Sequence, residues 1–259
     1  MRRFIMAQKK THSYKAASSG EVSSASEVKY TQAKPVGNAT GLRIGAAICW
    51  LAAIGLEVLA YLLLIGKVNL KFMPTLYQAI LAIVLDLVLV VVGSQLWKKA
   101  NRIKPASKKN KVLFWLWNNM GFLVAVLAFL PLIVLVLINK DMDKKTKTIV
   151  TAVAAIALIL GGLGSYDFDP VSAEEQNAAI ETISGDVFWT QFGKVYHTHD
   201  DCQALNRTDE LTYGTVEQAI AANRTRLCSF CAKRDSIEGV RTDDVPVDDV
   251  LDVVTDNAA

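Results

Sequence analysis

The stretch LRIGAAICWLAAIGLEVLAYLLLI at residues 42–65 decides the fold, because it runs for 24 residues with a single acidic group, Glu57. An α-helix needs about 20 apolar residues to cross the ~30 Å hydrocarbon core of a bilayer. Three further apolar stretches follow, at residues 72–97, 112–138 and about 148–164. Because a helix satisfies its backbone hydrogen bonds internally, lipid favours helices here. The sequence therefore predicts four transmembrane helices.

Charge divides the chain into two halves. Residues 1–164 contain 21 Lys and Arg and six Asp and Glu, whereas residues 165–259 contain seven and nineteen, a net charge of −12. The overall composition is 52% hydrophobic and 20% charged, with a mean hydropathy of +0.28. Such values exclude a collagen-like chain, a disulfide scaffold and a wholly disordered protein. The predicted fold class is mainly α: an integral-membrane four-helix bundle with a small α+β C-terminal domain.

Lysine and arginine counts beside the predicted spans indicate the orientation. Eight basic residues lie at or before Arg43 and seven in the 98–111 loop, against two in the 66–71 loop and four in the 139–147 loop. Because basic loops stay in the cytoplasm, both the N-terminus and the C-terminal domain are expected on the cytoplasmic side of the cell membrane. If the fourth stretch does not cross, the C-terminal domain lies outside instead. The 98–111 loop is also expected to contact anionic lipid.

Two acidic residues lie inside the predicted spans. Glu57 is fourteen residues from Arg43 and Asp86 is twelve residues from Lys98. These separations correspond to depths of about 21 Å and 18 Å from the cytoplasmic edge. Two carboxyl groups at similar depth would share a proton, so one hypothesis is a proton or cation path. The interpretation that we favour is structural, with protonated carboxyl groups bonded across helices.

Four soluble segments flank or follow the predicted spans. Residues 1–41, rich in Ser, Ala and Lys, are expected to form a disordered basic tail. Residues 165–186 predict a helical connector with Asp169 as its N-cap. Residues 187–234 predict a compact module, and residues 235–259 an acidic tail. Valine and leucine alternate with aspartate in residues 241–259, which could dock on a partner as a strand or helix, but we favour a solvated, frayed terminus there.

Local signals within the module predict two elements. Short runs of β-forming residues surround Phe192 and Gly193, which indicates a hairpin. Residues 216–223 follow a capping-box pattern made by Thr215 and Gln218, which indicates a helix.

Cysteine and histidine spacing in the module indicates a metal site. Cys202, Cys228 and Cys231 are three in number, so they cannot all pair as disulfides within one chain. The two-residue gap of Cys-Ser-Phe-Cys lets two thiolates converge on one ion. Tetrahedral zinc takes four ligands, and three cysteines with one histidine are a common structural set. The sequence offers two histidines near Cys202, which are His197 and His199.

A resemblance to a known module narrows this choice. The segment VFWTQFGKVYHTHDDCQALNR…GTVEQAIAANRTRLCSFC resembles a small bacterial zinc module of the form Gly-x-x-Tyr-His…Cys-x-x-Leu…Glu-x-Ala…Cys-x-x-Cys. That module is similar to the metal-binding half of the Ada DNA-repair domain. Its zinc-binding histidine directly follows the tyrosine, so the resemblance implies a structural Zn²⁺ held by four residues and leaves His199 as an exposed neighbour. The implied ligands are His197, Cys202, Cys228 and Cys231.

The resemblance has boundaries. Ada-type repair uses four thiolates, one of them a methyl acceptor, whereas this chain supplies three and a histidine. The net charge of −12 over residues 165–259 would repel phosphates, so no nucleic-acid partner is expected. The membrane part resembles uncharacterised multi-span bacterial proteins.

Three functions follow from these features. We favour a non-enzymatic multi-pass membrane protein whose structural-zinc module contacts an unknown protein partner. The alternative is a small proton- or cation-linked transporter or channel that uses Glu57 and Asp86. The third is a membrane-tethered zinc hydrolase with Asp200 or Asp201 beside an open site. It ranks last because the chain lacks Gly-x-Ser-x-Gly, His-Glu-x-x-His and phosphate-loop patterns.

Overall fold

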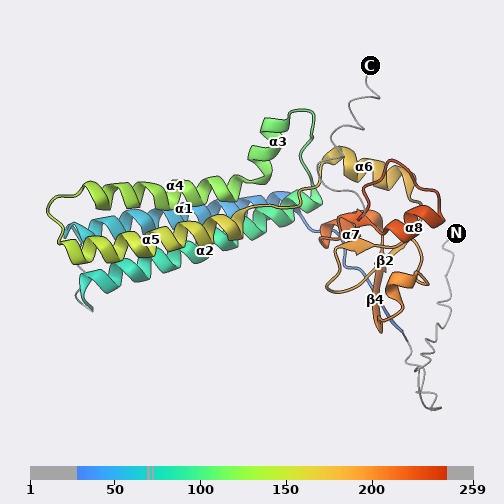
Figure 1. Ribbon diagram of the computed structural model, residues 1–259, viewed down its shortest axis with the longest axis horizontal. Helices are drawn as coiled ribbons and strands as arrows, with labels where there is room; N and C mark the ends of the chain where they lie inside the picture. Colours follow the sequence, from blue (N-terminus) through green and yellow to red (C-terminus); the bar gives the residue numbers. More distant parts are fainter. Residues whose placement is uncertain (1–27, 69–70, 72, 244–259) are drawn as a thin grey trace, which may run out of the picture. The chain divides into compact units, whose positions relative to one another are not determined.

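The computed structural model describes residues 28–68, 71 and 73–243, and the chain divides into two compact units (Figure 1). One unit is Gly37–Ala173. The other joins the residues up to Val36 with those from Glu174 onward. The segment before the first long helix therefore belongs to the same unit as the C-terminal half.

Four long helices build the first unit, as the apolar stretches predict. They are α1 (Ala39–Leu64), α2 (Thr75–Ile103), α4 (Met120–Ile138) and α5 (Lys144–Ser165). Each is long and apolar enough to cross a membrane, with mean hydropathies from 2.1 to 3.1. Polar caps extend them beyond the apolar runs: Asn38 caps α1 through Thr40, and Asp143 caps α5 through Thr146.

Small residues line the interior of this bundle. Phe129, Leu132 and Ile83 pack there against alanines from all four long helices. Alanine lets helix backbones approach closely, which favours association in lipid. Large apolar side chains such as Leu51 and Leu127 are exposed on the outside. A small-residue interior with an apolar exterior is what a lipid-facing bundle requires.

The prediction of one helix over residues 112–138 is wrong. This stretch forms α3 (Lys111–Asn118) and α4, with a break at Asn119, where φ is −104° and ψ is 22°. The side-chain amides of Asn118 and Asn119 donate to carbonyl oxygens one turn earlier, at 2.9 and 3.1 Å. Asparagine side chains compete in this way for backbone groups, so the pair disturbs the helix.

Two small sheets and several short helices form the second unit within the described residues. One sheet has the order β1 (Lys29–Gln32), β4 (Glu210–Gly214), β2 (Val187–Trp189), with β1 parallel and β2 antiparallel to β4. In the other, β3 (Val195–Tyr196) runs parallel to β5 (Arg226–Leu227). The helical elements are α6 (Ala173–Thr182), the 3-10 turn η1 (Gln203–Leu205), α7 (Val216–Ala221) and α8 (Ser229–Arg234).

Both local predictions within the module are confirmed. Phe188 and His197 exchange two backbone hydrogen bonds of 2.7 Å, which closes the hairpin. Thr215 and Gln218 form the reciprocal capping box at the start of α7. The helix ends at Ala221, slightly before the predicted end.

The predicted disordered tail is wrong over its described part, residues 28–41. β1 pairs with β4 along four residues, and the Tyr30 ring packs edge-on against Phe188 with centroids 6.4 Å apart. The hydroxyl of Tyr30 donates to Asp200 at 2.8 Å. Composition could not reveal this, because the pairing partner lies in the distant C-terminal half. Residues 1–27 of the predicted tail lie outside the described part.

The predicted connector helix begins later than expected. α6 starts at Ala173, and Asp169 is not its N-cap. The preceding segment is held to α2 instead, because Asp167 forms an ion pair of 2.9 Å with Arg102.

The predicted fraying is wrong over residues 241–243. Arg241 is buried, and the backbone N–H of Leu227 donates to the carbonyl of Arg241 at 2.9 Å. This contact extends the β5 edge within the same chain. Residues 244–259 lie outside the described part.

Candidate metal centre

The four predicted ligands come from three places in the second unit. His197 directly follows β3, Cys202 directly precedes η1, and Cys228 and Cys231 lie at the N-cap and in the first turn of α8. The hairpin between β2 and β3 brings His197 close to the three cysteines. One candidate ligand atom from each residue lies within 4.8 Å of all the rest. The four residues are only 1–5% exposed, so the cluster is inside the unit.

Distances within the cluster match tetrahedral coordination. Sγ of Cys202 lies 3.9 Å from Sγ of Cys228, and Sγ of Cys231 lies 3.8 Å from Nδ1 of His197. Two sulfur atoms each about 2.3 Å from a tetrahedral ion would lie about 3.8 Å apart. These cysteines form no disulfide, since the 3.9 Å between Cys202 and Cys228 is much longer than the ~2.0 Å of an S–S bond. The geometry therefore fits a single metal ion bound by these four residues.

Burial controls the protonation of the metal-free cluster. It lowers the pKa of His197 to about 4, so the imidazole is neutral and offers a lone pair. It raises the pKa of Cys202 to about 12 and also raises the pKa of Cys228, so these groups are thiols without an ion. A bound cation offsets the cost of burying a charged thiolate. The thiols therefore lose their protons when the metal binds, because the thiolate is the form that binds metal.

Backbone amides favour the thiolate form once an ion is present. The N–H of Ala204 bonds to the sulfur of Cys202, and those of Phe230 and Cys231 bond to the sulfur of Cys228. Hydrogen bonds to a charged group stabilise its charged form. The turns that follow Cys202 and Cys228 therefore both position the sulfurs and compensate their charge.

The structure separates the two candidate histidines. Nε2 of His199 lies 2.6 Å from Oδ1 of Asp235, outside the metal-ligand cluster, and its side chain is partly exposed. Thr198 donates to the other oxygen of Asp235 at 2.5 Å, and these two hydrogen bonds lower the pKa of the Asp235 carboxyl. Asp235 thus anchors the loop beside His197, a role that the sequence analysis missed because the residue lay in a predicted tail.

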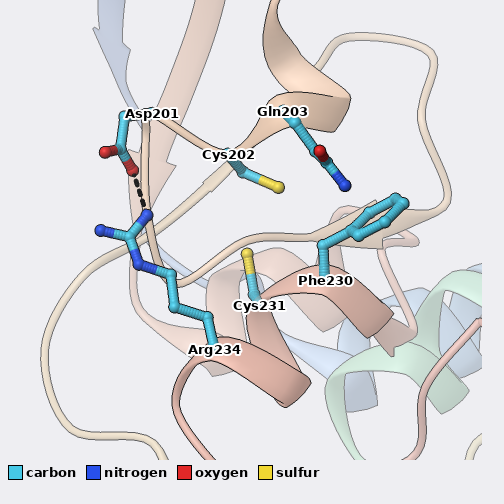
Figure 2. Close-up of a pocket in the computed structure, with 6 residues that line it drawn as sticks. All are labelled: Asp201, Cys202, Gln203, Phe230, Cys231 and Arg234. Atoms are coloured by element: carbon cyan, nitrogen blue, oxygen red, sulfur yellow. Dashed lines mark hydrogen bonds and ion pairs between the residues drawn. The ribbon is translucent and has the colours of Figure 1, made fainter.

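The two aspartates proposed as bases for an open zinc site have other partners. Asp200 accepts the hydroxyl of Tyr30, and Asp201 pairs with Arg234 at 2.6 Å. Figure 2 shows the Asp201–Arg234 pair at one side of a hollow of about 300 Å³, with the sulfur atoms of Cys202 and Cys231 directed toward its centre. The hollow lies beside two ligands, and neither aspartate belongs to the metal-ligand cluster.

Glu57 lies within the bundle and bonds to α4 next to the proline inside that helix. Its Oε1 accepts the backbone N–H of Leu132 at 3.2 Å, directly after Pro131 in α4. Proline distorts the helix around it and weakens the neighbouring backbone hydrogen bonds. The carboxyl group of α1 therefore accepts a backbone N–H of α4, which agrees with a structural role.

Asp86 is the more unusual of the two carboxyl groups. It is 0% exposed, and neither of its oxygens has a hydrogen-bond partner among the described residues. Asp86 on α2 and Glu57 on α1 are the buried acidic residues of the long helices in the described part of the chain. The favoured interpretation of hydrogen bonds across helices therefore holds for Glu57 with α4 but not for Asp86.

A buried polar cluster near the ends of α2 and α5 was missed from the sequence. Asn101 donates to the side-chain oxygen of Asn118 at 3.3 Å, and Asn119 accepts the backbone N–H of Asp167 at 3.0 Å. The Arg102–Asp167 ion pair lies in the same region and is almost fully buried. Two adjacent asparagines inside an apolar run were the available signal.

Comparison with known proteins finds no matching family model, no similar curated protein and no similar solved structure. What the structure shows is that the four residues implied as ligands lie together.

Proposed function

We propose that this chain is a multi-pass membrane protein whose C-terminal unit is stapled by one structural Zn²⁺ and contacts a protein partner. The observation that carries the proposal is the buried convergence of His197, Cys202, Cys228 and Cys231 within 4.8 Å. Buried polar groups that converge on a point without a ligand would be costly, and a cation offsets that cost.

A structural role for the ion agrees with the number and burial of its ligands. Four protein ligands complete a tetrahedral zinc site, whereas catalytic sites keep one position for water or substrate. The ligands connect β3 of the hairpin, η1 and α8 to one another. These elements are short, with two, three and six residues. Small units with limited apolar cores often depend on a metal to fold.

The pairing of β1 with β4 supports both ends of the chain lying on one side of the membrane. β1 precedes α1 and β4 follows α5, yet the two strands share a sheet. Segments on one side are separated by an even number of crossings, so α5 crosses together with α1, α2 and α4. Fifteen basic residues on that side against six on the other favour the cytoplasm.

Zinc content of the full-length protein tests the proposal. The full chain is needed because β1 belongs to the same sheet as β2 and β4. We expect one zinc per chain by elemental mass spectrometry, lost in His197→Ala and retained in the matched variant His199→Ala. Equal zinc in both variants, or none in the wild type, contradicts the proposed ligand set.

A second candidate function, proton- or cation-linked transport, is favoured by one observation: the buried Asp86 carboxyl has no hydrogen-bond partner among the described residues. Ionisable groups within a membrane often mark ion or proton paths. Reconstituted vesicles should then show a flux that Asp86→Asn abolishes and Glu57→Gln reduces. Absence of flux in the wild type removes this candidate and leaves the zinc proposal untouched.

A further inference from the structure

The third membrane crossing does not require α3. The nineteen residues of α4 extend about 29 Å and by themselves nearly span the ~30 Å hydrocarbon core. The eight residues of α3 precede α4 and leave its axis at the break (Figure 1). α3 is therefore an addition to the third crossing and needs an environment of its own.

The direction of α3 is set by hydrogen bonds to α2. The carbonyl oxygen of Trp117 accepts the indole N–H of Trp97 at 2.8 Å and the amide of Asn101 at 3.4 Å. Carbonyls at a helix end need such partners when they are away from water. The guanidinium of Arg43 lies 5.2 Å from the Trp117 ring and 5.7 Å from the Trp97 ring, which closes the same corner. Several side-chain contacts therefore stabilise the break between α3 and α4.

α3 leaves a large apolar surface uncovered. Val112 is 69% exposed, Leu113 59% and Trp115 41%. A set of exposed Val, Leu and Trp side chains within two helical turns is costly in water. Tryptophan also favours the boundary between lipid and water, where its ring is buried and its N–H stays near polar groups.

Positive charge leads directly into this apolar surface. Residues 98–111 contain seven Lys and Arg, and the chain has no Asp or Glu between Asp86 and Asp141. Lys109 and Lys111 are exposed immediately before and at the start of α3. An apolar helix face beside a run of lysines is complementary to an anionic lipid surface.

We infer that α3 is an interfacial helix whose Val112, Leu113 and Trp115 insert into an anionic phospholipid leaflet, with Lys109 and Lys111 at its headgroups. The inference rests on the membrane insertion in the proposed function. It adds the class of lipid that α3 and the 98–111 loop contact. α3 then holds the start of α4 at a defined depth, and the rest of the bundle with it.

The test uses the full-length protein in nanodiscs of phosphatidylcholine alone or mixed with phosphatidylglycerol. Quenching of Trp115 by lipids brominated near the headgroup is obtained by subtracting the signal of Trp115→Phe. Amide hydrogen exchange is followed in parallel at residues 112–117. We expect Trp115 to be quenched, and exchange in α3 to slow further when the anionic lipid is present.

Paired charge variants locate the lipid contact. Lys109→Gln with Lys111→Gln should reduce the effect of anionic lipid on α3 exchange by about fivefold for each lysine. The matched double variant Lys140→Gln with Lys145→Gln, exposed at the opposite end of the bundle, should leave α3 exchange unchanged.

Three results would overturn the inference. Unquenched Trp115 with protected amides in α1 and α4 would mean that the bundle inserts and α3 does not touch lipid. Protection of α3 that rises with protein concentration in detergent would assign its face to a second copy of the chain. Unprotected amides in all long helices would overturn membrane insertion itself, and with it the basis of the inference.

Discussion

The long-helix bundle and the C-terminal unit both bury polar side chains, but they arrange them in opposite ways. In the C-terminal unit four buried metal-ligand atoms lie within 4.8 Å of one another, and their spacing fits one ion. In the bundle, Glu57 accepts a backbone N–H, whereas Asp86 has no hydrogen-bond partner in the described chain. Convergence indicates a ligand, whereas an isolated buried carboxyl group indicates a proton.

This contrast has a physical origin. A cation stabilises several buried thiolates at once, so binding of the ion favours a fold in which these side chains lie close together. An isolated carboxyl group in an apolar interior avoids its desolvation cost by remaining protonated. The same burial therefore has different consequences in the two units, and each of the following variants tests one side of the difference.

The largest effect is expected from Cys228→Ser. Removing one thiolate should release the ion and unfold the C-terminal unit, because structural zinc contributes about 10–16 kcal/mol in small modules, as much as a whole domain's stability. Limited proteolysis and amide exchange of the full chain should show loss of protection in α8 and β3 with intact long helices. Cys49→Ser in α1 is the matched control, and a compact C-terminal unit in Cys228→Ser would contradict the prediction.

The next largest effect is expected from Arg102→Ala, which leaves the buried Asp167 carboxylate without its partner 2.9 Å away. Breaking one side of a buried ion pair costs about 3–5 kcal/mol. Thermal unfolding of the bundle in detergent should therefore occur at a lower temperature, without loss of zinc. Lys99→Ala, an exposed neighbour on α2, is the control. Equal unfolding temperatures for the two variants would show that the pair contributes little.

Asp86→Leu should act in the opposite direction. A buried polar group without a partner costs about 1–3 kcal/mol, so an apolar replacement should stabilise the bundle if Asp86 has no ligand. Resistance to denaturing detergent measures this, with Glu57→Gln as a nearly neutral comparison. If the variant is instead less stable, Asp86 has a partner such as a bound cation, and the contrast between the two units becomes weaker.

The smallest effect is expected from Tyr30→Phe, which removes the hydrogen bond to Asp200 and should cost about 1–2 kcal/mol of β1 docking. Burial and this carboxylate raise the pKa of Tyr30 from 10.0 to about 12. A freed tyrosine loses its proton first, so docking should weaken as pH rises from about 10 to 12. Ultraviolet titration of the wild type minus the variant measures the value. A tyrosine that titrates near pH 10 would mean that β1 is not docked.

Sequence reasoning succeeded where the signal is local. Apolar length predicted the four long helices, the capping pattern of Thr215 and Gln218 predicted α7, and a turn at Gly193 predicted the hairpin. It was wrong at the helix break at Asn119, because two asparagines can be read as polar helix ends or as a built interruption. Only their bonds to α2 and the 166–167 segment distinguish the two.

Composition and spacing alone account for the apolar helices, the division of charge and the set of cysteines and histidines that could hold an ion. The folded chain accounts for the rest: that His197 faces the cysteines while His199 pairs with Asp235, that β1 completes the sheet of the C-terminal unit, and that α3 leaves the third span. The reason is range. Hydropathy and capping act within a few residues, whereas a metal cluster, a parallel strand pair and a supported helix break depend on groups brought together from distant positions.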